Sequence, residues 1–257
     1  DPSAAAAEYG AEFRGDIEAV LSVEAVEACV SEGVRERGKI EGYRYFAFVD
    51  PSGGSADSMT MGIGHKEGTK AVLDVLREVR PPFSPEGVVA SFAKDLARYG
   101  ISSVTGDRYG GEWPREQFRK HGISYVANAR PKSEIYLDLI PRVNSGEVDL
   151  LDNPRIVSQI VGLERRTSRG GRDSIDHAPG GHDDVANAVA GCLVLIFEKV
   201  FKATQTVTTV SSYGYGGPVT DVQVIGHGEK DYRAGPFPPA PPTNVVLPPR
   251  RWPGMPS

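Results

Sequence analysis

Acidic residues occur at three places where the sequence predicts the end of a strand or the start of a helix. Asp50 ends the apolar run Tyr43–Asp50 and precedes Pro-Ser-Gly-Gly, and Asp107 ends a second short run. Asp183 and Asp184 open an apolar helical pattern. A carboxylate at the carboxyl end of a strand lies at the sheet edge where open α/β folds place their ligands. The spacing therefore predicts a ligand site at this edge.

The chemistry that suits converging carboxylates is divalent metal binding. Clustered acids repel one another and raise one another's pKa, and a divalent cation removes this conflict. Hard oxygen ligands suit Mg²⁺ or Mn²⁺. Two such ions about 4 Å apart can activate a water and stabilise the leaving oxygen of a phosphodiester. The predicted catalytic and metal-ligating residues are Asp50, Asp107, Asp183 and Asp184.

Each acid also has an ordinary structural explanation. Asp50 before Pro-Ser-Gly-Gly is typical of an Asx turn, and Asp107 before Arg-Tyr-Gly-Gly can punctuate a loop. Asp183 and Asp184 are typical of a helix cap with acids in the first turn. The combination of all three places, in this order, favours the metal site.

The elements that must position these acids follow the order three strands, helix, strand, helix, strand, helices. This order predicts an α/β ribonuclease H-like fold, with a mixed sheet of five or more strands flanked by helices and an added basic hairpin. A helical crossover makes the fourth strand parallel to an earlier one, most simply the first, which brings Asp50 and Asp107 together. The predicted strands are 43–50, 58–65, 70–79, 101–107 and 123–126, and the predicted helices are 85–99, 114–121, 132–144, 154–163 and 183–200.

The charge of the chain does not indicate a general affinity for nucleic acid. The formal net charge is −5, so contacts with DNA have to come from local basic patches. A hairpin around Gly170-Gly171 carries several arginines, whose guanidinium groups suit bidentate contact with phosphates. A solvated surface loop is an equally good explanation of this hairpin. The candidate DNA-binding residues are Arg165, Arg166, Arg169, Arg172, Arg108 and Lys132.

The two cysteines and the hydropathy indicate the cellular compartment. Cys29 and Cys192 both lie in apolar patterns, which predicts buried thiols in a reducing cytosol rather than a disulfide framework. The sequence has no 18-residue apolar span and no signal peptide.

Three segments differ in composition. Residues 1–39 are polar with helical spacing, which predicts a helical connector to something upstream. Residues 40–202 hold the predicted strands and helices of the α/β fold. Residues 203–257 are rich in Thr, Ser and Gly and then in Pro, which predicts a flexible tail.

Three motifs contain the candidate acids: Phe48-Val49-Asp50-Pro-Ser-Gly-Gly, Val104-Thr-Gly-Asp107-Arg-Tyr-Gly-Gly and Gly181-His-Asp183-Asp184-Val-Ala-Asn-Ala. They resemble the C-terminal nuclease domain of the large terminase subunit of tailed bacteriophages. The resemblance covers residues 40–202, and residues 1–39 resemble the segment that follows the ATPase domain in those proteins. The resemblance implies a ribonuclease H-like endonuclease with two Mg²⁺ or Mn²⁺ ions that cuts concatemeric phage DNA during genome packaging. It also implies the portal protein and the small terminase subunit as partners, and the cytoplasm of an infected or lysogenic bacterial host as the location.

One motif of the complete family is missing, and other functions stay open. The phosphate-binding loop Gly-x-x-x-x-Gly-Lys-Ser/Thr does not occur, so we expect no ATPase activity in this chain. Another ribonuclease H-like enzyme, such as a transposase or a Holliday-junction resolvase, fits the same pattern. A non-catalytic module that docks DNA or the portal, with the acids only capping turns, is the alternative from a different class.

Overall fold

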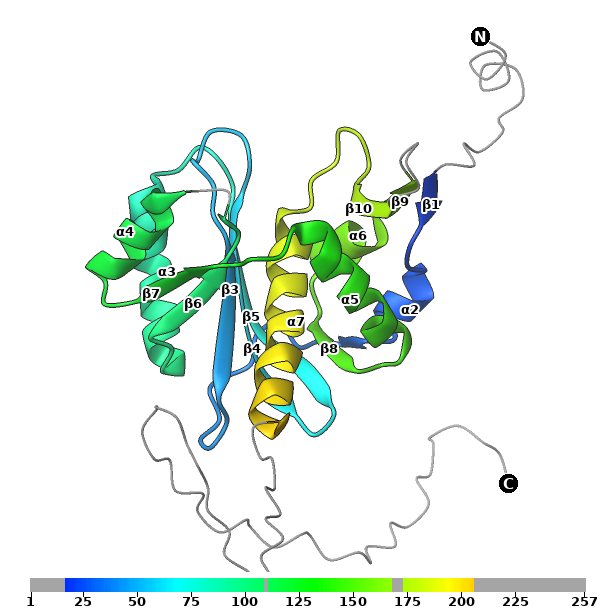
Figure 1. Ribbon diagram of the computed structural model, residues 1–257, viewed down its shortest axis with the longest axis horizontal. Helices are drawn as coiled ribbons and strands as arrows, with labels where there is room; N and C mark the ends of the chain where they lie inside the picture. Colours follow the sequence, from blue (N-terminus) through cyan, green and yellow to red (C-terminus); the bar gives the residue numbers. More distant parts are fainter. Residues whose placement is uncertain (1–16, 109–110, 168–172, 206–257) are drawn as a thin grey trace, which may run out of the picture. The chain divides into compact units, whose positions relative to one another are not determined.

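The computed structural model describes residues 17–108, 111–167 and 173–205, and within them an α/β fold (Figure 1). The strands are β1 (Ile17–Ala19), β2 (Val30–Ser31), β3 (Tyr45–Asp50), β4 (Met59–Glu67), β5 (Lys70–Val79), β6 (Ser103–Gly106), β7 (Ser124–Ala127), β8 (Val148–Leu151), β9 (Leu163–Thr167) and β10 (Asp173–His177). The helices are α2 (Val23–Glu27), α3 (Pro85–Tyr99), α4 (Glu112–Lys120), α5 (Lys132–Asn144), α6 (Pro154–Val161) and α7 (Asp184–Gln205).

The main sheet has seven strands in the order β2-β8-β5-β4-β3-β6-β7. Strands β3, β4 and β5 form an antiparallel meander, and β6 then lies parallel to β3 on its other side. The crossover between β5 and β6 is α3, which begins after the N-cap Ser84 and ends at Gly100 in the left-handed conformation. The predicted pairing of the first and fourth strands is confirmed, and the sheet is mixed as expected.

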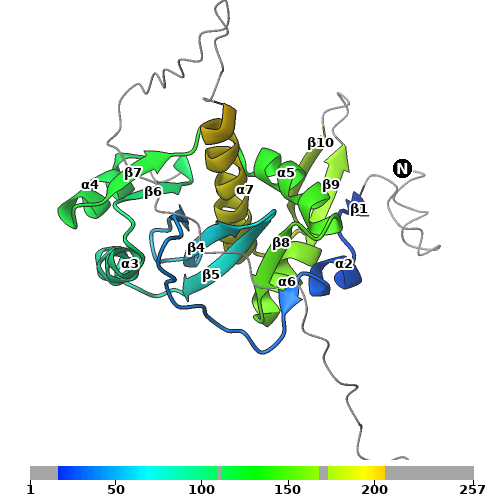
Figure 2. The ribbon, with the colours of Figure 1, turned by 90° about the horizontal axis from the view of Figure 1, so that it is seen from below.

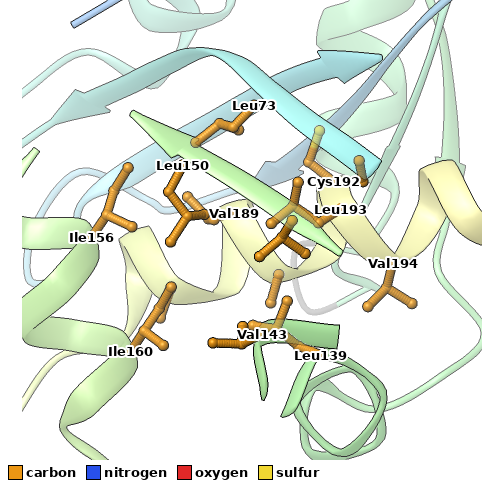
Figure 3. Packing of buried hydrophobic residues seen from close by; sticks show 14 of the residues in the cluster. Leu73, Leu139, Val143, Leu150, Ile156, Ile160, Val189, Cys192, Leu193 and Val194 are labelled. Atoms are coloured by element: carbon orange, nitrogen blue, oxygen red, sulfur yellow. The ribbon is translucent and has the colours of Figure 1, made fainter. Parts of the chain in front are cut away.

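Both faces of this sheet are buried under helices. Because side chains alternate along a strand, Phe46 and Phe48 of β3 face α7, while Tyr45, Ala47 and Val49 face the layer of α3 and α4. Figure 2 shows α3 and α7 on opposite sides of the sheet. The larger core lies between the sheet, α7, α5 and α6 (Figure 3).

Helix α7 packs closely against β3, and this contact sets its position along the strand. A Cβ on Gly191 would lie 2.5 Å from ring atoms of Phe48, so only glycine permits the observed approach. The Cys192 thiol donates to the carbonyl of Phe46 (3.7 Å). Helix α7 therefore runs antiparallel to β3, and its first turn reaches the end of β3 that carries Asp50.

The N-terminal part differs from the helical connector that the sequence predicts. Within residues 17–39 the helix is limited to the five residues of α2, which Ser22 caps by accepting from Ala25 N–H (3.2 Å). Strand β1 pairs with β9 in a second, three-stranded sheet, and β2 pairs with β8. Pairing with distant strands overrides local helical spacing in such short segments.

The structure can also be compared with the predictions for the cysteines, for membrane-spanning segments and for the segment boundaries. Cys29 and Cys192 are both buried and free, as predicted. None of the helices in the described part of the chain combines the length and the apolar character needed to span a bilayer. The Gly170-Gly171 turn and the 206–257 part of the predicted tail lie outside the described residues.

Candidate metal centre

Asp50 and Asp107 lie side by side at the carboxyl ends of two parallel strands. Val49 of β3 is in register with Gly106 of β6, and the N–H of Asp107 donates to the carbonyl of Val49 (3.1 Å). The residues that follow the register pair are Asp50 and Asp107. The sheet topology therefore brings these two predicted acids to one edge.

A close contact with the neighbouring strand fixes the backbone that carries Asp107. The Tyr125 hydroxyl of β7 donates to the carbonyl of Asp107 (2.5 Å). A Cβ on Gly106 would lie 2.3 Å from this hydroxyl oxygen, so glycine is required beside Tyr125. Tyr125 thus holds the backbone at the end of β6 in place through the Asp107 carbonyl.

Asp50 is the acid whose environment most opposes a negative charge. Burial raises its pKa, a hydrogen bond from Asn187 of α7 opposes this rise, and Asp107, Asp184 and Asp183 add repulsion, giving a pKa of about 8. The other three predicted acids therefore all lie close enough to Asp50 to raise its pKa. The Asx-turn explanation does not account for Asp50, since Ser52 is the side chain that bonds within the loop, to Gly54 N–H (3.3 Å) and Asp57 carbonyl (2.6 Å).

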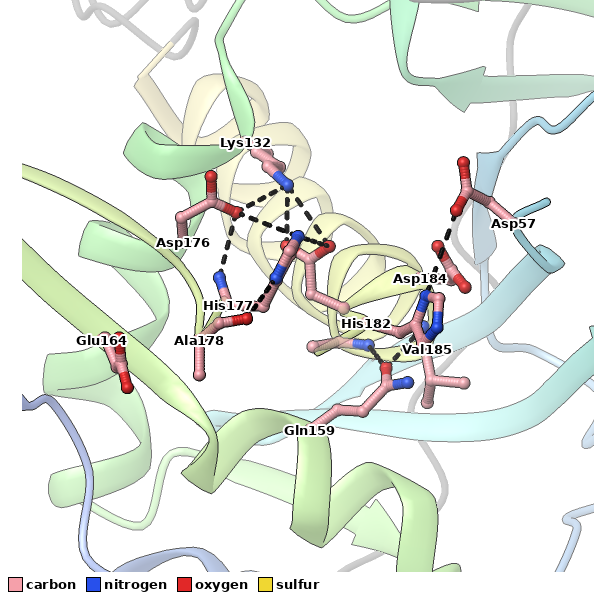
Figure 4. Close-up of polar contacts among 12 residues, drawn as sticks. Asp57, Lys132, Gln159, Glu164, Asp176, His177, Ala178, His182, Asp184 and Val185 are labelled. Atoms are coloured by element: carbon pink, nitrogen blue, oxygen red, sulfur yellow. Dashed lines mark hydrogen bonds and ion pairs between the residues drawn. The ribbon is translucent and has the colours of Figure 1, made fainter. Parts of the chain in front are cut away.

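The first turn of α7 is capped by a residue from another helix. Oε1 of Gln159 in α6 accepts from Val185 N–H (2.8 Å) and Ala186 N–H (3.0 Å) (Figure 4). These are N–H groups that a helix start leaves without partners of its own. Gln159 therefore supplies the cap, and the carboxylates of Asp183 and Asp184 are engaged elsewhere.

The Asp184 carboxylate contacts the loop that leads into β4. Its Oδ2 accepts from Ser58 N–H (3.2 Å). The backbone carbonyl of Asp184 accepts from the Thr60 hydroxyl (2.7 Å). Burial raises the pKa of Asp184, and the nearby Asp57 adds repulsion. His182 Nδ1 lies 4.0 Å from Asp57 and is largely exposed, so it can pair with this acid when protonated.

The Asp183 carboxylate contacts α5. Both of its oxygens accept from the Lys132 ammonium (2.9 and 3.2 Å), and Oδ2 also accepts from the Tyr136 hydroxyl (2.8 Å). Burial and the charge of Asp183 raise the pKa of Tyr136 well above its usual value, so this hydroxyl remains a donor. Helix α5 thus orients the Asp183 carboxylate through Lys132 and Tyr136.

A second group of metal-ligating side chains overlaps with this site. Among the described residues, Asp176, His177 and Asp183 form the group whose ligand atoms lie within 4.8 Å of one another. The Lys132 ammonium lies 2.8 Å from Asp176 and 2.9 Å from Asp183, so the protein's own cation already occupies the position between them. The four predicted aspartates, two at strand ends and two at the start of α7, remain the candidate metal centre.

The structure separates the candidate DNA-binding residues into different groups. Lys132 lies within the acid cluster instead of on a free surface. Arg166 of β9 donates to the carbonyl of His177 (2.7 Å) across the hairpin, which is a structural contact. Arg165 lies on the same strand, and Arg108 is exposed immediately after Asp107. Arg169 and Arg172 lie outside the described residues.

Sequence reasoning missed several residues of this site. Asn187 follows Asp183 by one helical turn and is a single polar residue among apolar ones, a spacing that predicts a shared face. Tyr136 likewise follows Lys132 by four residues on α5. Gln159 and Asp176 gave no signal, because their contacts with α7 and Lys132 depend on tertiary packing alone.

Comparison with known proteins identifies the fold. No protein-family model matches the chain, and a search of curated proteins finds no match. The large terminase nuclease of the thermophilic phage G20c matches with a TM-score of 0.58 at 17% identity, over 68% of this chain and 96% of that chain. This chain has the fold of a large terminase nuclease domain.

Other large terminases show the same fold. The nuclease domain of Thermus phage P74-26 matches with a TM-score of 0.56 at 14% identity, covering 68% of this chain and 94% of that chain. The large terminase of bacteriophage HK97 matches with a TM-score of 0.56 at 14% identity, over 69% of this chain and 43% of the longer one. The predicted ribonuclease H-like α/β architecture is thereby confirmed.

Proposed function

We propose that this chain is the metal-dependent nuclease domain of a viral terminase large subunit and that it cuts double-stranded DNA during genome packaging. The observation that carries the proposal is the convergence of Asp50, Asp107, Asp183 and Asp184 on one sheet edge, with Asp50 strongly disfavoured as an isolated anion. The terminase fold supports it. Structures of the G20c nuclease with bound magnesium and with bound cobalt share this fold.

The side chains present fit divalent cations. Carboxylate oxygens are the ligands that Mg²⁺ and Mn²⁺ prefer. Burial first, and then repulsion from the other acids, disfavours the charge of Asp50, and a cation would compensate both. We propose that Asp50, Asp107 and the Asp183-Asp184 pair would hold two ions. The bound ions would supply an activated water and stabilisation of the leaving oxygen.

The protein's own groups position these carboxylates. Asn187 orients Asp50 by donating a hydrogen bond, Ser58 orients Asp184, and Tyr136 orients Asp183. Each donor leaves further lone pairs on the carboxylate available, so orientation does not prevent ligation. Pre-orientation of this kind is what supports a metal site beyond its direct ligands.

The DNA would reach this edge past basic side chains. We propose that Arg108, exposed beside Asp107, Arg165 of β9, and Arg169 and Arg172 between β9 and β10 in the sequence contact the phosphate backbone. With a net charge of −5, binding should be weak and should fall steeply with salt. Portal protein and small terminase subunit would be partners of the assembled motor in the bacterial cytoplasm.

Nicking of supercoiled plasmid with Mn²⁺ or Mg²⁺ tests this function. Wild-type protein should nick the plasmid, and Asp50→Asn and Asp107→Asn should each lower the rate by at least about 100-fold, since each removes a ligand charge. The matched control is Asp152→Asn, whose carboxylate accepts from Gly33 N–H (3.0 Å). Unchanged cutting by both site variants would refute the assignment, and cleavage limited to four-way junctions would favour a resolvase.

A further inference from the structure

Lys132 is the first residue of α5 and lies between two acids from different elements. Its Nζ is 2.8 Å from Asp176 Oδ1 on β10 and 2.9 and 3.2 Å from the two oxygens of Asp183 (Figure 4). The Lys132 side chain is 33% exposed, whereas that of Asp183 is only 9% exposed. The ammonium therefore neutralises a buried carboxylate that has little access to water.

This ion pair conflicts with metal binding at Asp183. Both oxygens of Asp183 already accept from Lys132, and a divalent cation on the same carboxylate would lie within a few ångströms of the ammonium. Two like charges about 4 Å apart in a partly buried site repel each other by several kcal/mol. The lysine and the cation therefore compete for Asp183.

Asp176 offers Lys132 a place that does not involve the metal centre. The Asp176 side chain is 41% exposed and already lies 2.8 Å from the ammonium. Its position relative to α5 is fixed, since the neighbouring Ile175 N–H donates to the Ser133 hydroxyl (2.9 Å), one residue after Lys132. Lys132 can therefore leave Asp183 without losing its charge partner.

We propose that Lys132 is a positioning residue that holds Asp183 until a divalent cation displaces it, and that Asp176 accepts the displaced ammonium. This inference rests on the proposed metal centre and adds a built-in competitor to it. Without metal, Lys132 neutralises and orients Asp183. The cation concentration needed to load the site then depends on how strongly Lys132 pairs with Asp183 compared with Asp176.

Calorimetric titration of the protein with Mn²⁺, without DNA, tests the competition. Lys132→Met should bind Mn²⁺ about tenfold more tightly than wild type, because one charge-assisted pair no longer has to be broken. Asp176→Asn should bind Mn²⁺ about tenfold more weakly, because Lys132 then has only Asp183. In the double variant Lys132→Met/Asp176→Asn, the asparagine should have no further effect.

The cycle of single and double variants separates this role from simpler ones. If Asp176 were itself a metal ligand, Asp176→Asn would weaken binding equally with and without Lys132, and the proposal would be overturned. Lys132→Arg should restore an affinity near that of wild type. Arg130→Met removes a neighbouring cation that pairs with Asp138 and Glu198 (2.7 Å each), so a gain as large as that of Lys132→Met would indicate general electrostatics instead.

The outcomes also distinguish this inference from the proposed function. Plasmid nicking that depends on Asp50 together with an unchanged Mn²⁺ affinity of Lys132→Met would leave the nuclease in place and refute the competition. Absence of Mn²⁺ binding by both wild type and Lys132→Met would overturn the metal centre, and the competition with it. Thermal unfolding of each variant checks that the fold is retained.

Discussion

Replacing Asp50 with asparagine should stabilise the metal-free protein at neutral pH. The pKa of Asp50 is about 8 in the folded chain, mainly because of burial, whereas an unfolded aspartate titrates near 3.9. The folded state therefore binds the proton more tightly than the unfolded state does. The contribution of Asp50 to stability is then most favourable below pH 4, declines as the pH rises to 8, and is constant above pH 8.

The magnitude follows from this difference in pKa. Between about pH 3.9 and pH 7 the raised pKa lowers the unfolding free energy by about 1.36 kcal/mol per pH unit. At pH 7 the total cost is about 4 kcal/mol. The Asp50 side chain is partly exposed, and solvent screening reduces the expected cost to about 2 kcal/mol. Asparagine removes the charge, keeps the shape and retains an oxygen that accepts from Asn187. For a domain of this size the melting temperature should rise by about 6 °C.

Thermal unfolding in EDTA between pH 4 and 9 measures the effect. The gain of Asp50→Asn over wild type should be small at pH 4 and should grow until pH 8. Added Mn²⁺ should stabilise wild type and not the variant, which reverses their order. Glu116→Gln, at an exposed position of α4, is the control and should change little. A variant that is less stable than wild type at pH 8, or a difference that does not vary with pH, would refute the reasoning.

Three further changes have defined expected outcomes. Gln159→Leu leaves Val185 N–H and Ala186 N–H without their acceptor and should lower the unfolding free energy by about 1–3 kcal/mol in urea titration, whereas a cap of no importance would give no change. Gly191→Ala should lower the unfolding free energy by about 1–3 kcal/mol, because a Cβ would lie 2.5 Å from the Phe48 ring. Gly87→Ala on α3 is the control: its Cβ would meet nothing closer than 3.8 Å, so the same urea titration should show no change or a slight gain in stability. Asn187→Ala removes the hydrogen bond that lowers the pKa of Asp50. The pH above which the stability of the metal-free protein becomes constant should therefore rise from about 8. A fall in this pH would contradict the described contact.

The sequence was sufficient for the parts of the fold that local chemistry specifies. Ser84, Pro85 and Gly100 bound α3 as predicted, since N-caps, first-turn prolines and left-handed glycines act within a few residues. It was insufficient for β1, β2 and β8, because two to four residues carry too little periodicity and become strands only by pairing with distant ones.

For the candidate metal centre, too, the sequence predicted one part and the tertiary structure decided another. The sequence by itself determined the types and order of the acids, and the crossover through α3 determined that Asp50 and Asp107 would end neighbouring parallel strands. Only the tertiary structure decided that Gln159 caps α7 and that Lys132 and Tyr136 hold Asp183, because these contacts join residues that are 26 to 51 positions apart. Close packing of Gly191 on Phe48 places the first turn of α7 beside Asp50, and a contact of this kind depends on how two surfaces fit, which no local pattern encodes.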